Sequence, residues 1–161
     1  MLKVLFICTG NTCRSPMAEM ILKSELARTD LPFKVEVSSA GLSAIAGEKT
    51  SELTRQLLSS EGLKPDKHYA RVVDRDLVED SDLILVMTAD HRLQLCARFP
   101  GAVNKTYLLK EFSGMTKTGL NIEDPAGTGL QKYRQVLEEI RACVKKIIII
   151  FKEGTDEDCP G

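Results

Sequence analysis

The chain has 161 residues, of which 43% are hydrophobic and 28% are charged. This length fits a single compact domain, and the composition excludes an intrinsically disordered chain. Lys and Arg, 22 in all, nearly balance the 23 Asp and Glu residues, which gives a formal net charge of -1. Because no long basic block appears either, we do not expect nucleic acid as a partner.

No apolar stretch of the sequence is long enough for a membrane span. The longest one near the C-terminus, residues 147–151, is far shorter than the about 20 residues that cross a bilayer. Residues 1–3 do not lead into the apolar core of a signal peptide. We therefore expect a monomeric cytoplasmic protein that does not associate with membranes.

The cysteines point to free thiols rather than to disulfides or a metal site. Their number is odd and they form no Cys-x-x-Cys pair: Cys8, Cys13, Cys96, Cys143 and Cys159. The two histidines are far in sequence from the closely spaced cysteines, so a local zinc signature is missing. We expect no metal and no cofactor, and a catalytic thiol becomes the possibility to examine.

The N-terminal third of the chain predicts a strand, a loop, a helix and a second strand. The apolar run at residues 3–7 is typical of a buried strand that ends at Cys8. After a short loop, Ser15-Pro16 supplies an N-cap and a first-turn proline for a helix that runs to about residue 28. Residues 33–37 alternate in polarity, which predicts the second strand.

The rest of the chain continues this alternation of strands and helices. We predict, in order, a helix around residues 53–58, a strand at 82–87, a helix at 91–98, a strand at 106–109, a long loop at 110–129 and a helix at 130–151. This pattern favours one α/β domain with a doubly wound parallel sheet of about four strands and helices on both faces. We place the domain at residues 1–153 and an acidic C-terminal tail at 154–161.

The loop between the first strand and the first helix has the composition of an anion site. Cys8 ends the strand, and Arg14 precedes the helix by one residue in this prediction. Backbone N–H groups of such a loop and the helix N-terminus can surround a tetrahedral oxyanion. The same donors would favour a nucleophilic thiolate at Cys8, and the Arg14 guanidinium would bind two phosphoryl oxygens. Ser15 fits either a helix cap or a hydrogen bond to the sulfur atom.

The stretch Cys8-Thr9-Gly10-Asn11-Thr12-Cys13-Arg14-Ser15-Pro16 resembles the low-molecular-weight protein tyrosine phosphatase family. Nearly the whole chain takes part in the resemblance. It also includes Ser39-Ala40-Gly41, His68-x-x-Arg71, Met87-Thr88 and Asp124-Pro125. The resemblance implies a flavodoxin-like sheet and a metal-free phosphatase that acts on phosphorylated proteins.

The resemblance also implies a role for individual residues. Cys8 would be the nucleophile that forms a phosphocysteine intermediate, Arg14 the phosphate clamp, and Asp124 the general acid and then the general base. The phosphate-binding loop, or P-loop, would comprise Thr9, Gly10, Asn11, Thr12, Cys13 and Ser15. Ser39 and His68 would support it through a hydrogen-bonded network with Asn11 and Ser15.

Two positions bear on the substrate. Family members that act on phosphotyrosine usually carry an apolar residue at the position of Thr12, whereas the loop with Thr12 resembles the bacterial protein arginine phosphatase branch. The Thr12 hydroxyl would accept a hydrogen bond from a guanidinium group or align a water molecule. Ala126 follows Asp124-Pro125 where an aromatic residue is usual, which removes a stacking surface for a tyrosine ring. We therefore favour phosphoarginine as the substrate.

Several alternatives stay open. The first is a tyrosine phosphatase with the same mechanism, and the second is an arsenate reductase, since arsenate suits the same loop. The third is a phosphate-binding or thiol-redox sensing module without catalysis. Cys8 alone would also fit a buried core thiol, and Asp124 alone an ordinary turn. Cys13 would serve either in packing or in a disulfide with Cys8 under oxidation.

Overall fold

The computed structural model describes residues 1–154 and contains one parallel sheet of four strands. The strands pair in the order β2-β1-β3-β4 and are β1 (Leu2–Cys8), β2 (Val35–Gly41), β3 (Leu83–Val86) and β4 (Thr106–Leu108). The central strand β1 has β2 on one side and β3 on the other, so the chain reverses its direction of winding at β1. In open sheets of this kind the ligand crevice lies at the carboxyl end of the strand where winding reverses.

Helices alternate with the strands along the chain. They are α1 (Arg14–Leu26), α2 (Glu52–Ser60), α3 (Arg75–Asp80), α4 (Ala89–Arg98), α5 (Leu109–Ser113) and α6 (Leu130–Glu153), with short 3-10 turns η1 (Pro65–Lys67) and η2 (Pro100–Lys105).

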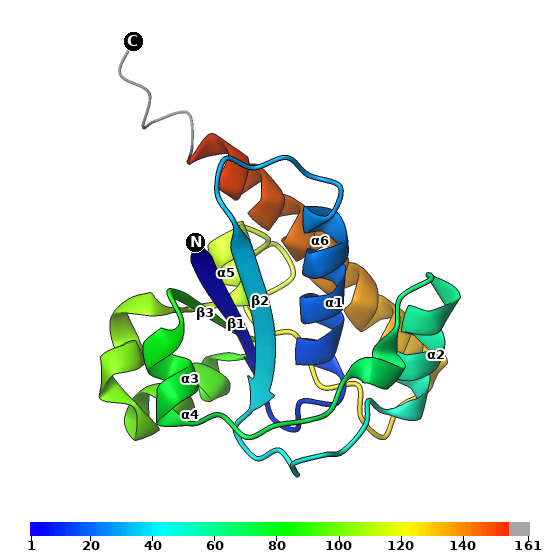
Figure 1. Cartoon of the computed structure of the whole chain (residues 1–161). Helices are drawn as coiled ribbons and strands as arrows, with labels where there is room; N and C mark the ends of the chain where they lie inside the picture. The colour runs from blue at the N-terminus through cyan, green and yellow to red at the C-terminus, as the bar shows by residue number, and fades with distance from the viewer. Residues whose placement is uncertain (155–161) are drawn as a thin grey trace.

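Both faces of the sheet are covered, as the near-continuous apolar strands predict. On one face, Phe6 and Leu85 lie in a core shared with α1 and α6. On the other face, Leu5 and Ile84 pack in a core shared with α3 and α4. Figure 1 shows α1 and α6 on one side of the sheet and α3 and α4 on the other. The predicted doubly wound α/β fold is confirmed.

The second strand differs from its prediction at both ends. We expected residues 33–37, but β2 runs from Val35 to Gly41 because its pairing with β1 continues until Gly41 stands opposite Cys8. Ser38 and Ser39 interrupt the alternation of polar and apolar residues, so the sequence pattern does not predict the strand beyond residue 37. A Cβ atom at Gly41 would lie 2.6 Å from the carbonyl oxygen of Thr9, so glycine lets the end of β2 approach the loop closely.

The start of the first helix was also predicted wrongly. α1 begins at Arg14, its N-cap residue is Cys13, and no side chain caps it. Ser15 lies inside the helix, where its hydroxyl is directed to Cys8 instead of to the helix backbone.

Other corrections concern short helices. α5 occupies the start of the stretch at 110–129 that was predicted as a loop. Leu109, predicted as the last residue of a strand, is the first residue of α5. α3 was not predicted at all, because six residues are too few to show a helical period. α4 begins two residues before the predicted start at His91, and α6 ends two residues after the predicted end.

The acidic tail predicted for 154–161 lies, from residue 155 onward, outside the described residues, and so does Cys159. The proposed domain boundary therefore stays a prediction. Within residues 1–154, no helix is both long and apolar enough to span a bilayer.

Candidate active site

The loop between β1 and α1 contains one residue with a left-handed backbone conformation. Asn11 has a φ of 57°, and it is the one non-glycine residue with a positive φ in the described part of the chain. Asparagine tolerates this left-handed conformation better than most residues because its side chain can hydrogen-bond locally. The conformation directs the backbone N–H of Asn11 to Sγ of Cys8 at 3.3 Å.

Ser15 is a second hydrogen-bond partner of the Cys8 sulfur atom. The two atoms, Cys8 Sγ and Ser15 Oγ, are 2.9 Å apart, and Ser15 Oγ also accepts a hydrogen bond from Nδ2 of Asn11 at 2.8 Å. Because the Asn11 amide already donates to Ser15, the serine hydroxyl proton is free to point at the sulfur. A negatively charged sulfur accepts both of these hydrogen bonds.

Asn11 is held by residues from two further segments, β2 and the stretch at 68–71. Its Nδ2 donates to Ser39 Oγ at 2.9 Å, its Oδ1 accepts from the backbone N–H of Arg71 at 3.1 Å, and its carbonyl oxygen accepts from His68 Nε2 at 2.8 Å. The structure therefore brings together the four residues expected in a network, Asn11, Ser15, Ser39 and His68. Such a network stabilises a strained backbone conformation.

Glu19 joins this network, which the sequence analysis missed. Ser39 Oγ donates to Glu19 Oε2, and Nδ1 of His68 lies 3.8 Å from the same oxygen. Glu19 is one helical turn after Ser15 in α1, so its spacing from the loop was the signal that would have found it.

Arg14 connects the loop to the segment that carries Asp124. Its side chain is buried, and Nη1 donates to the carbonyl oxygen of Ile122 at 2.9 Å. Ile122 is fixed in turn by its backbone N–H, which donates to the carbonyl oxygen of Met87 just after β3. Nη2 of Arg14 lies 3.7 Å from Oδ2 of Asp124, whose half-exposed carboxylate also accepts a hydrogen bond from the N–H of Ala126.

These residues surround a small pocket of about 170 Å³ at the carboxyl end of β1. Its walls combine the sulfur of Cys8, the polar loop and the carboxylate of Asp124. The lining residues are Cys8, Thr9, Gly10, Thr12, Cys13, Arg14, Asp124 and Ala126. All of these residues except Ala126 were predicted from the sequence as site residues. Ala126 was predicted as a position that influences the choice of substrate.

Cys13 is buried beside the pocket as a free thiol. It donates to Ser51 Oγ at 3.1 Å, and its sulfur is 3.7 Å from the hydroxyl of Tyr133. Burial, followed by the hydrogen bond with Cys13, raises the pKa of Tyr133. Cys8 is a free thiol too, so the disulfide between the two stays a prediction.

His91 is the main residue that the sequence analysis missed. Its Nε2 is 2.8 Å from Oγ1 of Thr9, although 82 residues separate the two in sequence. The ring is buried, and its Nδ1 has no hydrogen-bond partner among residues 1–154. Burial and then the charge of Arg14 lower the pKa of His91 from 6.5 to about 4, so the ring is neutral near pH 7. Thr88 was the one local signal in the sequence. It is the N-cap of α4 and accepts a hydrogen bond from the N–H of His91, which places this histidine near the end of β3.

Among residues 1–154, no three His, Cys, Asp or Glu side chains are grouped so that they could hold a metal ion.

Known proteins of similar sequence are phosphatases. Residues 3–156 match the family model described as low molecular weight phosphotyrosine protein phosphatase. A protein-arginine-phosphatase of Geobacillus stearothermophilus is 34% identical over 145 residues, which cover 90% of this chain and 93% of that protein. The low molecular weight protein-tyrosine-phosphatase PtpB of Staphylococcus haemolyticus is 34% identical over 146 residues, covering 91% of this chain and 97% of that protein.

Solved structures that superpose on this fold are phosphatases as well. The YwlE arginine phosphatase from Geobacillus stearothermophilus superposes with a TM-score of 0.89 at 31% identity, covering 100% of this chain and 99% of that chain. A low molecular weight protein tyrosine phosphatase from T. tengcongensis has a TM-score of 0.82 at 35% identity, covering 92% and 99%. Since these matches span almost the full length of each protein, the chain belongs to the low-molecular-weight phosphotyrosine protein phosphatase family and is a cysteine-based protein phosphatase.

Proposed function

We propose that this phosphatase hydrolyses phosphoarginine side chains of proteins. The observation that carries the proposal is that Thr12, a residue with a hydroxyl group, lines the same pocket as Cys8. A hydroxyl accepts hydrogen bonds from the N–H groups of a guanidinium, whereas an apolar side chain would suit a phenyl ring. Ala126 lines the same pocket, and none of its lining residues in the described chain is aromatic.

In the first step, the thiolate of Cys8 attacks the phosphorus atom. The S–P bond forms as the P–N bond to the substrate guanidino group breaks, and Asp124 donates a proton to the leaving nitrogen. Arg14 binds phosphoryl oxygens through the edge of its guanidinium that does not contact Ile122. The products of this step are an unmodified arginine and a phosphocysteine at Cys8.

In the second step, water attacks the phosphocysteine. Asp124, now ionised, accepts a proton from that water, the S–P bond breaks, and inorganic phosphate leaves. The electron pair of the broken bond returns to Cys8, where the hydroxyl of Ser15 and the N–H of Asn11 stabilise the thiolate. The position of Asp124 beside Arg14, at the mouth of the pocket, supports this double role.

A direct comparison of two substrates tests the proposal. We would measure kcat/KM for one peptide carrying phosphoarginine and one carrying phosphotyrosine, with the Cys8→Ser protein as the blank. We expect a preference for phosphoarginine of at least tenfold. A preference for phosphotyrosine would contradict the substrate assignment and leave the mechanism intact, whereas trapping no phosphocysteine on rapid acid quenching would contradict the mechanism.

The second candidate is a protein tyrosine phosphatase. PtpB of Staphylococcus epidermidis is 35% identical over 147 residues, so overall identity does not separate this alternative from the first. We prefer phosphoarginine over phosphotyrosine because of the pocket, where Thr12 and Ala126 favour the guanidino group.

We also propose that the protein acts as a cytoplasmic monomer that needs no metal or cofactor and binds neither nucleic acid nor membranes.

A further inference from the structure

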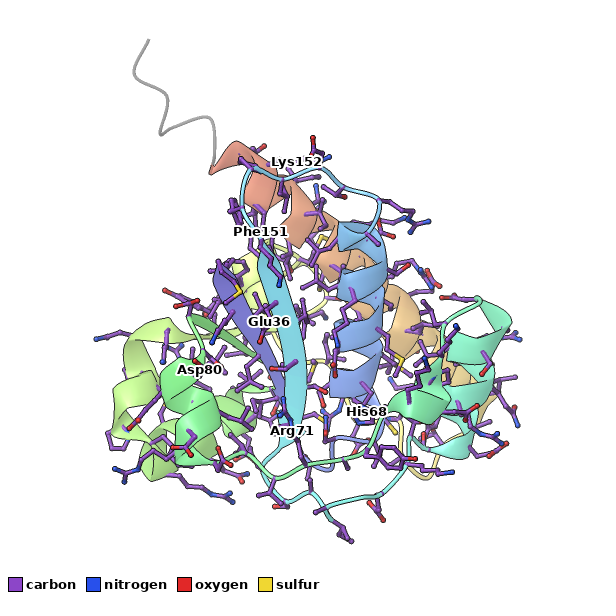
Figure 2. The ribbon with its side chains drawn as sticks, in the orientation of Figure 1. Glu36, His68, Arg71, Asp80, Phe151 and Lys152 are labelled. Carbon is purple, nitrogen blue, oxygen red and sulfur yellow. The ribbon has the colours of Figure 1, made fainter. Side chains whose placement is uncertain are left out.

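A second cavity, of about 680 Å³, lies on the other side of the residues that hold the phosphate-binding loop. It lies between α1 and the segment at residues 63–71, and it shares no residue with the pocket around Cys8. The lining residues are Glu19, Met20, Lys23, Ser24, Ser39, Leu63, Lys64, Lys67, His68, Tyr69 and Arg71. In Figure 2, His68 lies near the foot of α1 and Arg71 near the carboxyl end of β2.

The cavity carries a strong excess of positive charge. Four of its lining residues are lysine or arginine, and Glu19 is the one carboxylate. Glu19 is already engaged, because it accepts hydrogen bonds from Lys23 and from Ser39. Lys64 and Lys67 are exposed, and neither makes an ion pair with a described residue. An anionic ligand would therefore find cations that the protein does not neutralise itself.

The cavity also has apolar surface next to these charges. Met20 and Leu63 contribute to its lining, and Tyr69 is 57% exposed. A planar organic group can stack on such a ring, and the volume lies in the range of small-molecule sites. Cations beside an exposed aromatic ring suit a molecule that combines a phosphate with an organic group.

We propose that this cavity is an effector site for a small phosphate-bearing molecule. The phosphate lies among Lys64, Lys67 and Arg71, and the organic group lies against Tyr69. Free inorganic polyphosphate has the same kind of phosphate group as such a molecule but lacks the organic group. Binding experiments with and without the organic group therefore distinguish the two ligands.

Binding here acts on the active site through Asn11. Ser39, His68 and Arg71 line this cavity, and the same three residues hydrogen-bond Asn11 in its left-handed conformation. Ser39 and His68 contact Asn11 through their side chains and Arg71 through its backbone N–H, so a ligand that holds Arg71 in its present position favours the anion-binding form of the loop. By linkage, it strengthens oxyanion binding at Cys8 by the same factor by which an oxyanion at Cys8 strengthens effector binding.

The binding test uses backbone amide NMR shifts of the Cys8→Ser protein, so that no probe is turned over. The probes are pyrophosphate, AMP and adenosine. We expect two groups of shifted amides with AMP, one in the loop around Thr12 and one around Leu63 and Tyr69. Pyrophosphate shifts both groups at higher concentration, and adenosine shifts neither at the concentrations where AMP saturates.

Charge-matched variants identify the cavity as the source of the second group. Lys64→Gln with Lys67→Gln should weaken AMP binding there at least tenfold and leave the loop shifts in place. Lys34→Gln with Lys145→Gln removes the same charge from exposed positions outside the cavity and should leave both groups unchanged. Shifts confined to the loop, or a second group that survives in Lys64→Gln/Lys67→Gln, would overturn the proposal. Adenosine binding as tight as AMP would overturn the role of the phosphate, and pyrophosphate binding as tight as AMP would overturn the role of Tyr69.

Activity of the unsubstituted enzyme tests the coupling separately. Saturation of the second site with AMP, at concentrations too low to shift the loop amides of the Lys64→Gln/Lys67→Gln protein, should raise kcat/KM about fivefold, and that variant should keep its basal kcat/KM and lose the response. An effector that binds at the cavity without changing kcat/KM would contradict the coupling through Asn11. Because binding is read by NMR in an inactive protein, this proposal and the proposed substrate fail independently.

Discussion

His91 in α4 contacts the hydroxyl of Thr9, the residue that directly follows Cys8, across 2.8 Å. The unpartnered Nδ1 of the buried ring indicates which nitrogen carries the proton, because an orphaned acceptor is tolerated better than an orphaned N–H donor. Nε2–H then donates to Thr9 Oγ1. The Thr9 hydroxyl proton is left free to hydrogen-bond an oxyanion in the pocket.

This relationship predicts a positioning role for His91. In the His91→Leu protein the Thr9 hydroxyl loses its partner, and we expect phosphate to inhibit about five- to tenfold more weakly, since one hydrogen bond contributes about 1 kcal/mol. His91→Gln can still donate to Thr9 and should recover most of the affinity. Inhibition constants for phosphate measure both effects. Equal losses in the two variants would show that packing of the ring, rather than its hydrogen bond, is what matters.

The lowered pKa of His91 predicts a pH-dependent stability. The unfolded chain binds a proton at His91 below about pH 6.5, whereas the buried ring of the native state, between Arg14, Asp90 and Asp124, binds it only near pH 4. The free energy of unfolding should therefore fall by up to about 3 kcal/mol as the pH decreases from 6.5 to 4, and this contribution should not change further below pH 4. Urea unfolding at several pH values, with His91→Gln as the reference, isolates the effect. Parallel pH curves for the two proteins would contradict it.

Removing the carboxyl of Asp124 should affect turnover far more than binding. We expect Asp124→Asn to lower kcat by about 10²–10⁴-fold, because proton donation to the leaving group is lost. The isosteric amide keeps the shape of the segment anchored by Arg14, so the inhibition constant of phosphate should change less than tenfold. Unchanged kcat with phosphoarginine would remove Asp124 from the mechanism.

Thr12 is expected to select the substrate. The Thr12→Ile exchange should lower kcat/KM for phosphoarginine about tenfold or more and raise it for phosphotyrosine. Thr12→Ser keeps the hydroxyl and should keep the preference of the parent enzyme. If both substrates lose activity equally in Thr12→Ile, the side chain supports the loop and does not choose between substrates.

Asn11 should matter for stability as well as for activity. Asn11→Gly permits the positive φ but deletes the side-chain hydrogen bonds with Ser15, Ser39 and Arg71, so we expect a loss of about 2–3 kcal/mol in the free energy of unfolding. Asn11→Ala loses the same bonds and is strained at this φ, and it should be about 1 kcal/mol less stable than Asn11→Gly. Urea unfolding of the three proteins tests this order. A more stable alanine variant would show that the loop relaxes to a negative φ.

Features that depend on neighbouring residues were predictable from the sequence. The apolar runs of β1 and β3 identify strands covered on both faces, and the short segment from Cys8 to Arg14 already contains the nucleophile and the anion-binding groups. Asp124 came from the family resemblance, since 116 positions separate it from Cys8 and no local pattern joins them. The buried guanidinium of Arg14 is what brings these two parts together.

Several features that depend on tertiary contacts were missed or left open. Nothing near His91 reveals its contact with Thr9, because the two meet only after β1 and β3 pair. The sequence left Ser15 open between a helix cap and a hydrogen bond to Cys8, and in the structure its hydroxyl lies at the sulfur atom and caps no helix. The end of β2 was missed because strand pairing, rather than side-chain polarity, extends it to Gly41.

The hydrogen bond from Arg14 to the carbonyl oxygen of Ile122 has a consequence for how this fold tolerates variation. It fixes one point in the polar stretch between α5 and α6, and Ile122 is itself tied to Met87 after β3. Of the residues before that point, 116–120 are exposed, whereas Asn121 accepts a hydrogen bond from the N–H of Ala89 at the start of α4. Chimaeras that keep residues 121–125 and borrow residues 116–120 from a relative should remain active, so this short segment offers a place to graft new docking sequences onto the enzyme.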